Sequence, residues 1–135
     1  MKAAERASSV LIYTLSVAVL TEAANEMERV GIEAKEFFVL DGVEEEPFPA
    51  GLAKRLTMSK PTLALHLRNL EKKALICRAF DLHDHRHHRL DLTTEGRETV
   101  AKAGDILSAR YGARLEKLED HERREFGRLL QKLLD

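Results

Sequence analysis

The sequence has one cysteine, no tryptophan and few aromatic residues, and each shortage excludes a class of protein. Cys77 has no second cysteine to pair with, so no disulfide can form within the chain. This is consistent with a reducing compartment and with the cytoplasm. Aromatic residues make up 5% of the 135 residues, so the 44% hydrophobic content must build an aliphatic core. We expect one small, mainly helical domain with helical extensions.

Long hydrophobic runs are also missing. The most apolar stretch, residues 10–20, is interrupted by Thr14 and Ser16 and is too short to cross a bilayer. Helical periodicity continues through it, so we interpret it as a buried helix face rather than a targeting segment, and we predict no membrane contact. A helix that is apolar on most sides needs cover, and a second copy of the chain is the natural source.

Catalytic motifs are absent as well. The sequence contains no nucleophile elbow, no phosphate-binding glycine loop, no HExxH and no cysteine–histidine pair at catalytic spacing. We therefore predict that the protein is not an enzyme and needs no cofactor.

The charge is divided unevenly along the chain, although the net charge is only −1. Residues 53–90 hold nine lysines and arginines against three acids, a net charge of +6, and also five of the six histidines. The remainder carries a net charge of −7. A basic segment within an acidic chain predicts that this segment binds a polyanion such as double-stranded DNA.

The spacing of apolar residues predicts the order of elements. Helices are expected over 3–29 and 32–42, the second ending at Gly42, followed by a loop at 44–49 that its two prolines keep irregular. A short helix (52–56), a longer helix (59–73), strands at 75–82 and 89–92, and two C-terminal helices separated near Asp120 complete the chain. This order predicts a mainly α fold: a winged helix-turn-helix with a small antiparallel β-wing and N- and C-terminal dimerisation helices. The predicted parts are 1–30 (N-terminal dimerisation helix), 31–96 (DNA-binding module) and 97–135 (C-terminal dimerisation helices).

The helix at 59–73 has the features of a DNA-reading helix. Ser59 is a good N-cap and Pro61 suits the first turn, where a missing N–H costs little and the other free amides could meet a phosphate. Leu63, Leu67 and Leu70 form an inward stripe. Residues near the opposite side are the predicted DNA contacts, with Lys73 also expected to meet the DNA backbone: Ser59, Lys60, Thr62, Leu65, Arg68, Asn69 and Lys72.

The segment between the two strands is polar and rich in histidine. Its length suits a wing that reaches a minor groove, where Arg86 would meet focused negative potential and Asp84 could orient the guanidinium. His85 and His87 are predicted to contact DNA beside it. The apolar strand residues Phe80, Leu82, Leu90 and Leu92 are expected to pack on the helices.

Together these motifs resemble the MarR family of bacterial and archaeal transcriptional regulators. The resemblance rests on LAKRL-TMSKPT, on LRNLEKKALICR, on Asp81-x-x-Asp84-x-Arg86 and on Leu92-Thr93-x-Glu95-Gly96. It implies a winged helix whose first and last helices form an intertwined homodimer on DNA. It also implies a small aromatic effector, with Tyr13, Phe37, Phe38 and Tyr111 as candidates for its pocket, although apolar residues at helical spacing also suit a plain core. This chain departs from the family in its wing histidines and in Ala74, which replaces the glycine that commonly ends the recognition helix.

Two local features allow sharper alternatives. His83, His85, His87 and His88 could chelate zinc or nickel, could hydrogen-bond phosphate or water, or could strengthen DNA binding when protonated. A single tip seldom closes a tetrahedral shell, so we predict no metal site. Cys77 could act as a redox switch or serve as a small strand residue, and its surroundings give little reason for activation.

The sequence thus predicts a dimeric, sequence-specific DNA-binding transcriptional regulator, a repressor that responds to an effector. A winged-helix module that binds protein instead of DNA is the alternative, because an outward Leu65 also suits a protein contact. A metal-responsive regulator that uses the wing histidines is a further alternative.

Overall fold

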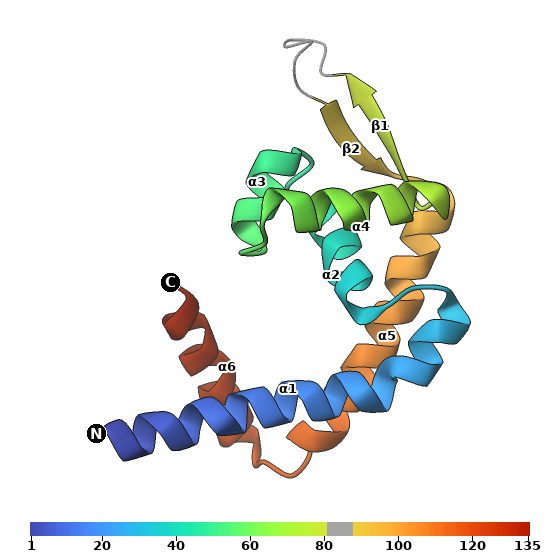
Figure 1. The fold of residues 1–135 in the computed structure, drawn as a ribbon. Helices are drawn as coiled ribbons and strands as arrows, with labels where there is room; N and C mark the ends of the chain where they lie inside the picture. Colours follow the sequence, from blue (N-terminus) through green and yellow to red (C-terminus); the bar gives the residue numbers. More distant parts are fainter. Residues whose placement is uncertain (81–87) are drawn as a thin grey trace. The chain divides into compact units, whose positions relative to one another are not determined.

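The computed structural model describes residues 1–80 and 88–135 of the chain. In chain order the elements are α1 (Lys2–Val30), α2 (Ala34–Val43), α3 (Pro49–Arg55), α4 (Lys60–Lys72), β1 (Ile76–Phe80), β2 (His88–Leu92), α5 (Thr94–Leu115) and α6 (Asp120–Leu134) (Figure 1). The chain divides into two compact units. We call Ala24–Asp105 the winged unit, and Met1–Ala23 with Ile106–Asp135 the helical unit. The predicted fold class is confirmed.

Helix α2 begins at a local capping box and packs closely against α3 near its end. Its N-terminus has a capping box, in which the Glu36 carboxylate accepts the backbone N–H of Glu33 at 2.9 Å. The predicted end at Gly42 is wrong, because the helix continues to Val43. A Cβ atom at position 42 would lie 2.9 Å from Leu52 Cδ1, so this glycine allows α3 to approach α2 closely.

Helices α3 and α4 form the predicted helix-turn-helix. Helix α3 starts earlier than predicted, because Pro49 occupies its first turn instead of lying in the preceding loop. The turn between the helices uses a left-handed residue, Thr57, with φ 52°. Leu63, Leu67 and Leu70 of α4 are buried, as predicted, and α4 packs against α2 and α3.

The end of α4 is a Schellman motif built on Ala74. The amide of Leu75 donates to the Leu70 carbonyl at 3.0 Å and the amide of Ala74 donates to the Glu71 carbonyl at 2.9 Å. Ala74 has φ 60°, in the left-handed region that glycine adopts most easily.

Replacing Ala74 with glycine is therefore expected to stabilise the protein. Relief of the left-handed strain outweighs the added flexibility of the unfolded chain, for a net gain of about 0.5–1 kcal/mol. Thermal unfolding followed by circular dichroism should show a melting temperature a few degrees higher, by roughly 2–5 °C. Ala101→Gly, at an exposed site inside α5, should lower it instead. A lower melting temperature for Ala74→Gly would contradict the strained end of α4.

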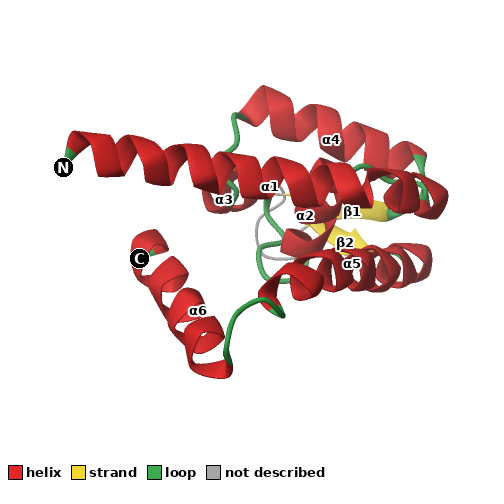
Figure 2. Ribbon diagram, turned by 90° about the horizontal axis from the view of Figure 1, so that it is seen from below, coloured by secondary structure: helices red, strands yellow, loops and turns green. Residues whose placement is uncertain are grey.

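The wing is an antiparallel ribbon of the two strands β1 and β2, drawn in yellow in Figure 2. Ile76 is paired with Leu92, and Phe80 is paired with His88. Leu90 and Leu92 are buried, as predicted, and the amide of Leu90 donates to the Pro47 carbonyl at 2.8 Å. The prediction for Phe80 is wrong: its side chain is 64% exposed, and its ring lies 4.7 Å from that of His88. At Phe80 the ribbon extends beyond the helices (Figure 1), so this side of β1 has no helix to pack against there. Leu82 lies outside the described residues.

Helix α5 is joined to β1 through Thr93. The Thr93 Oγ1 atom accepts the Gly96 amide at 2.9 Å, as expected of an N-cap, and donates to the Ala74 carbonyl at 2.7 Å. The Thr93 amide donates to the Leu75 carbonyl at 3.1 Å. The start of α5 is thereby fixed to the end of α4.

The helical unit leaves a broad apolar surface exposed. Helix α6 starts at Asp120, just after the predicted break, and Glu119 forms a capping box with Glu122. On the polar side of α6, a hydrogen bond from Arg128 lowers the pKa of Glu125. The exposed apolar residues come from α1 and α6: Val10, Leu11, Ile12, Tyr13, Val17, Phe126, Leu129, Leu130, Leu133 and Leu134.

Helix α1 has a longer apolar stretch than the one predicted at residues 10–20. By length and composition alone it could span a membrane, since its most apolar window of 18 residues has a mean hydropathy of 1.5 and is 11% buried. The expectation of a stretch too short to span is therefore wrong. The low burial in the single chain agrees with the expectation that a second copy covers this helix. A helix in the core of a protein, or one covered by a partner chain, can have the same length and apolar composition.

Candidate nucleic-acid interface

The outer surface of α4 is the candidate interface. Its residues alternate between two sides because the buried leucines recur at helical spacing and turn the intervening residues outward. The seven contacts predicted for this helix belong to α4 or its N-cap, and all are exposed except the half-buried Asn69: Ser59, Lys60, Thr62, Leu65, Arg68, Asn69 and Lys72. The helix thus presents hydroxyl, amide, guanidinium and ammonium groups on a rigid apolar support.

The N-terminus of α4 is already well hydrogen-bonded. The Thr62 amide donates to Ser59 Oγ at 3.3 Å, and the Leu63 amide donates to the Ser59 carbonyl at 3.0 Å. Pro61 has no amide hydrogen, so this terminus offers a phosphate fewer N–H groups than an uncapped helix start would. Ser59 Oγ donates to Thr62 Oγ1 at 2.8 Å, which leaves the Thr62 hydroxyl proton available as a donor on the outer surface.

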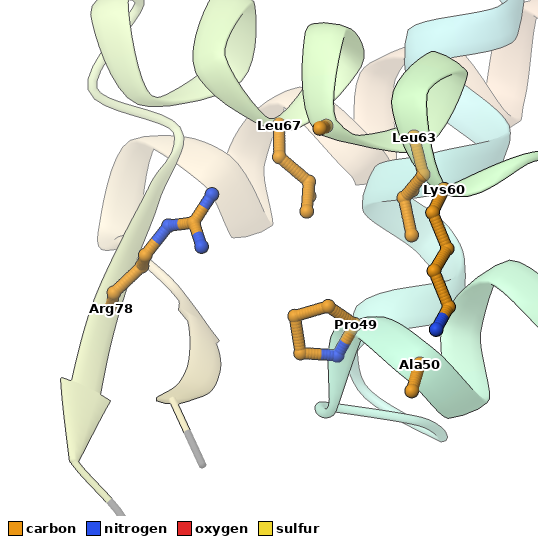
Figure 3. A pocket seen from close by; sticks show the side chains of 7 residues that line it. Pro49, Ala50, Lys60, Leu63, Leu67 and Arg78 are labelled. Carbon is orange, nitrogen blue, oxygen red and sulfur yellow. The ribbon is translucent and has the colours of Figure 1, made fainter. Parts of the chain in front are cut away.

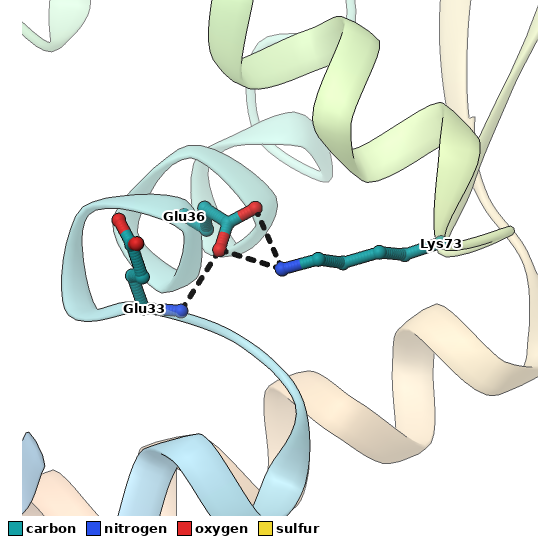
Figure 4. A network of polar contacts seen from close by, with 3 residues as sticks. All are labelled: Glu33, Glu36 and Lys73. Atoms are coloured by element: carbon teal, nitrogen blue, oxygen red, sulfur yellow. Dashed lines mark hydrogen bonds and ion pairs between the residues drawn. The ribbon is translucent and has the colours of Figure 1, made fainter.

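A buried carboxylate holds the C-terminal end of α4. Glu36 of α2 is 3% exposed, and its two carboxylate oxygens accept Lys73 Nζ at 2.8 and 3.1 Å (Figure 4). The same carboxylate caps α2 through the Glu33 amide. Lys73 was expected to meet the DNA backbone, and this expectation is wrong because its ammonium group is directed toward α2. The pair fixes the end of α4 relative to α2.

A second ion pair neutralises the one acidic residue of α4. The Nε atom of Arg78, on β1, donates to Glu71 Oε1 at 2.7 Å. Both side chains are about one-third exposed. The neutralised carboxylate repels a phosphate less than an unpaired one, so the basic character of the surface is preserved.

An open pocket of about 320 Å³ lies beneath α4. Leu63 and Leu67 point into it from α4, Pro49 faces them from α3, and the Arg78 guanidinium is directed inward from β1 (Figure 3). The pocket is lined by Pro49, Ala50, Lys60, Leu63, Ala64, Leu67 and Arg78. The lining is mainly apolar, and of its two cations Arg78 is already paired with Glu71, which leaves Lys60.

Several predicted residues lie outside the described residues or belong to different units. His83, His85, Arg86 and His87, with Asp81 and Asp84, lie outside the described residues. Among the residues that are described, no group of three or more histidine, cysteine or acidic side chains could hold a metal ion. Of the four effector candidates, Phe37 and Phe38 meet edge to face at 5.2 Å in the winged unit, while Tyr13 and Tyr111 belong to the helical unit. Cys77 is an exposed residue of β1.

Two residues of this region, Glu36 and Arg78, were not predicted from the sequence. Glu36 had a local signal, because Glu33 and Glu36 have the three-residue spacing of a capping box. Its partner Lys73 is 37 positions away and had no signal. Arg78 was counted only as part of the basic segment, and its pairing with Glu71 depends on the turn at Ala74.

The recognition helix α4, its support α3 and the ribbon β1–β2 define a winged helix-turn-helix protein. No protein-family model matches the chain. The HTH-type transcriptional repressor Rv2887 of Mycobacterium tuberculosis is 26% identical over 125 residues, covering 91% of this chain and 90% of the relative. The HTH-type transcriptional repressor Mb2911 of Mycobacterium bovis matches with the same values.

Solved structures extend the comparison. The S. aureus MepR–DNA complex is similar with a TM-score of 0.81 and 27% identity, covering 93% of this chain and 95% of that chain. A MarR transcriptional regulator from Methanosarcina mazei has a TM-score of 0.84 at 23% identity, with coverage of 96% and 94%, and supports the fold. The predicted resemblance to the MarR family is confirmed.

Proposed function

We propose that this protein is a homodimeric, sequence-specific DNA-binding transcriptional repressor. The observation that carries the proposal is the outer surface of α4, where basic and polar side chains stand on the buried stripe Leu63, Leu67 and Leu70. A helix of this kind fits a major groove. The similar MepR chain was solved in complex with DNA, and the similar mycobacterial proteins are repressors. A DNA-binding role also supports a cytoplasmic location and gives no reason to expect an enzyme.

The proposed homodimer is supported by the apolar surface of the helical unit. Helix α6 presents four apolar residues on one side, since each lies three or four positions from another, and all are exposed in the single chain: Phe126, Leu129, Leu130 and Leu133. Helix α1 adds Leu11, Ile12 and Tyr13. Burial of this surface against a second copy would remove it from water, and each buried leucine contributes roughly 1.5–3 kcal/mol. Two copies would read half-sites about one helical turn apart.

An effector remains part of the proposal. The predicted residues Phe37 and Phe38, which meet edge to face in the winged unit, are one candidate contact for it. The pocket beneath α4 is a second, because a ligand there would contact Leu63 and Leu67 on the inner side of the recognition helix. A ligand that displaced these side chains would change the position of α4.

The proposal predicts steep salt dependence of DNA binding. Purified protein should select genomic fragments and protect two half-sites in footprinting. Operator affinity should fall about 10³-fold or more between 50 and 200 mM salt if six or more phosphates are neutralised.

Arg86→Ala should weaken binding several-fold without changing the melting temperature, since we assign this residue to the minor groove. Absence of binding to any duplex at low salt would instead favour the protein-interaction module.

A further inference from the structure

Leu65 occupies the centre of the outer surface of α4. Successive residues of a helix are about 100° apart, so Leu65 lies on the side of α4 almost directly opposite Leu63, Leu67 and Leu70. Those three leucines are buried, whereas the Leu65 side chain is 49% exposed. The core is already supplied by the inward stripe, so packing within the chain does not explain a leucine at this position.

The surroundings of Leu65 are those of a groove-facing residue. Pro61 lies one turn before it and is exposed, and together the two make a small apolar area. Thr62 and Asn69 lie on one side of this area, and Arg68 lies on the other. When a helix enters a major groove, the residue at the centre of its outer surface meets the base edges rather than the phosphates at the rim.

A leucine can neither donate nor accept a hydrogen bond, so it can read only apolar groups. The major groove presents one apolar group among the four standard bases, the C5 methyl of thymine. We propose that Leu65 determines specificity by contacting a thymine methyl group in each half-site. This inference rests on the proposed function and goes beyond it, because it names the base and the atom that are read.

The test removes the methyl group and nothing else. Each thymine of the footprinted operator is replaced in turn by deoxyuridine, and the affinity of the full-length protein is measured at fixed salt. One methyl group removed from a buried contact should weaken binding about fourfold, and the same change in both half-sites should weaken it about 15-fold. The effect should appear at one or two thymines per half-site.

Variants then assign the effect to Leu65. Leu65→Ala should bind the thymine and deoxyuridine operators equally well. Leu65→Met, which keeps an apolar side chain of similar length, should retain the discrimination. Arg68→Ala should bind both operators more weakly and keep the ratio between them, since its side chain is polar and lies beside the apolar area.

The outcomes separate the inference from the function on which it rests. If the wild-type protein binds its operator but no deoxyuridine substitution weakens it, or if Leu65→Ala still discriminates, the inference is overturned and DNA binding stands. If the wild-type protein binds no DNA at low salt, the proposed function fails and the inference fails with it.

Discussion

Leu130→Glu will convert the proposed homodimer into monomers and abolish operator binding at micromolar protein concentration. Leu130 is 43% exposed in the single chain and lies at the centre of the apolar side of α6. In a two-fold symmetric dimer the substitution introduces two unpaired carboxylates into one interface. At about 3 kcal/mol for each, the dimerisation constant should fall by roughly 10⁴-fold. Sedimentation velocity measures the oligomeric state, and a gel-shift assay measures the affinity.

The adjacent residue supplies the control. Gln131 lies on the polar side of α6, so Gln131→Glu adds the same charge without entering the apolar surface. This variant should remain dimeric and bind the operator within about twofold of the wild type. The core of the winged unit contains no residue of α6, so the Leu130→Glu variant should keep most of the helical circular dichroism of the wild type. A dimeric Leu130→Glu would show that α6 does not form the interface.

Gly96→Ala is expected to destabilise the winged unit severely. A Cβ atom at this position would overlap the carbonyl oxygen of Leu75 and would lie 3.0 Å from its carbonyl carbon. That oxygen already accepts the Thr93 amide, and Thr93 joins Ala74 to Gly96. The backbone of β1 or of α5 must therefore shift and break this junction. A loss of about 3 kcal/mol or more, and a melting temperature lower by roughly 10 °C, should follow.

Gly104→Ala is the matched control on the same helix. A Cβ atom there would lie 3.6 Å from Phe37 Cε1, an ordinary van der Waals distance. Because alanine favours the helix over glycine, this variant should be as stable as the wild type or more stable by up to about 1 kcal/mol. Thermal unfolding of the two variants measures the difference. Equal melting temperatures for both would contradict the close approach of Gly96 to Leu75.

Several features of the fold could be predicted because their causes are local. Leu63, Leu67 and Leu70 were assigned inward from their spacing alone, and they are buried. Ser59 was recognised as a cap, since a hydroxyl before a periodic run accepts the first free amides of a helix. The seven α4 positions followed from the same periodicity.

Other features could not be predicted, because their causes lie far away in the chain. Gly42 was assigned to a helix end, yet its role is to admit Leu52, a contact that no neighbouring residue announces. Strand alternation gave the correct face for Phe80 but could not tell where the helices beneath that face end. Lys73 was assigned to DNA because its charge was visible and its buried partner Glu36 was not.

The sequence by itself determined which residues form helices and strands, which side of α4 turns inward, and that the basic charge gathers around this helix. These properties depend on residues within a few positions of one another. Only the tertiary structure decided that Glu36 directs Lys73 away from the interface and that Arg78 pairs with Glu71. These facts depend on how the α2, α4 and β1 backbones pack together, and packing brings together residues that the order of the chain keeps apart.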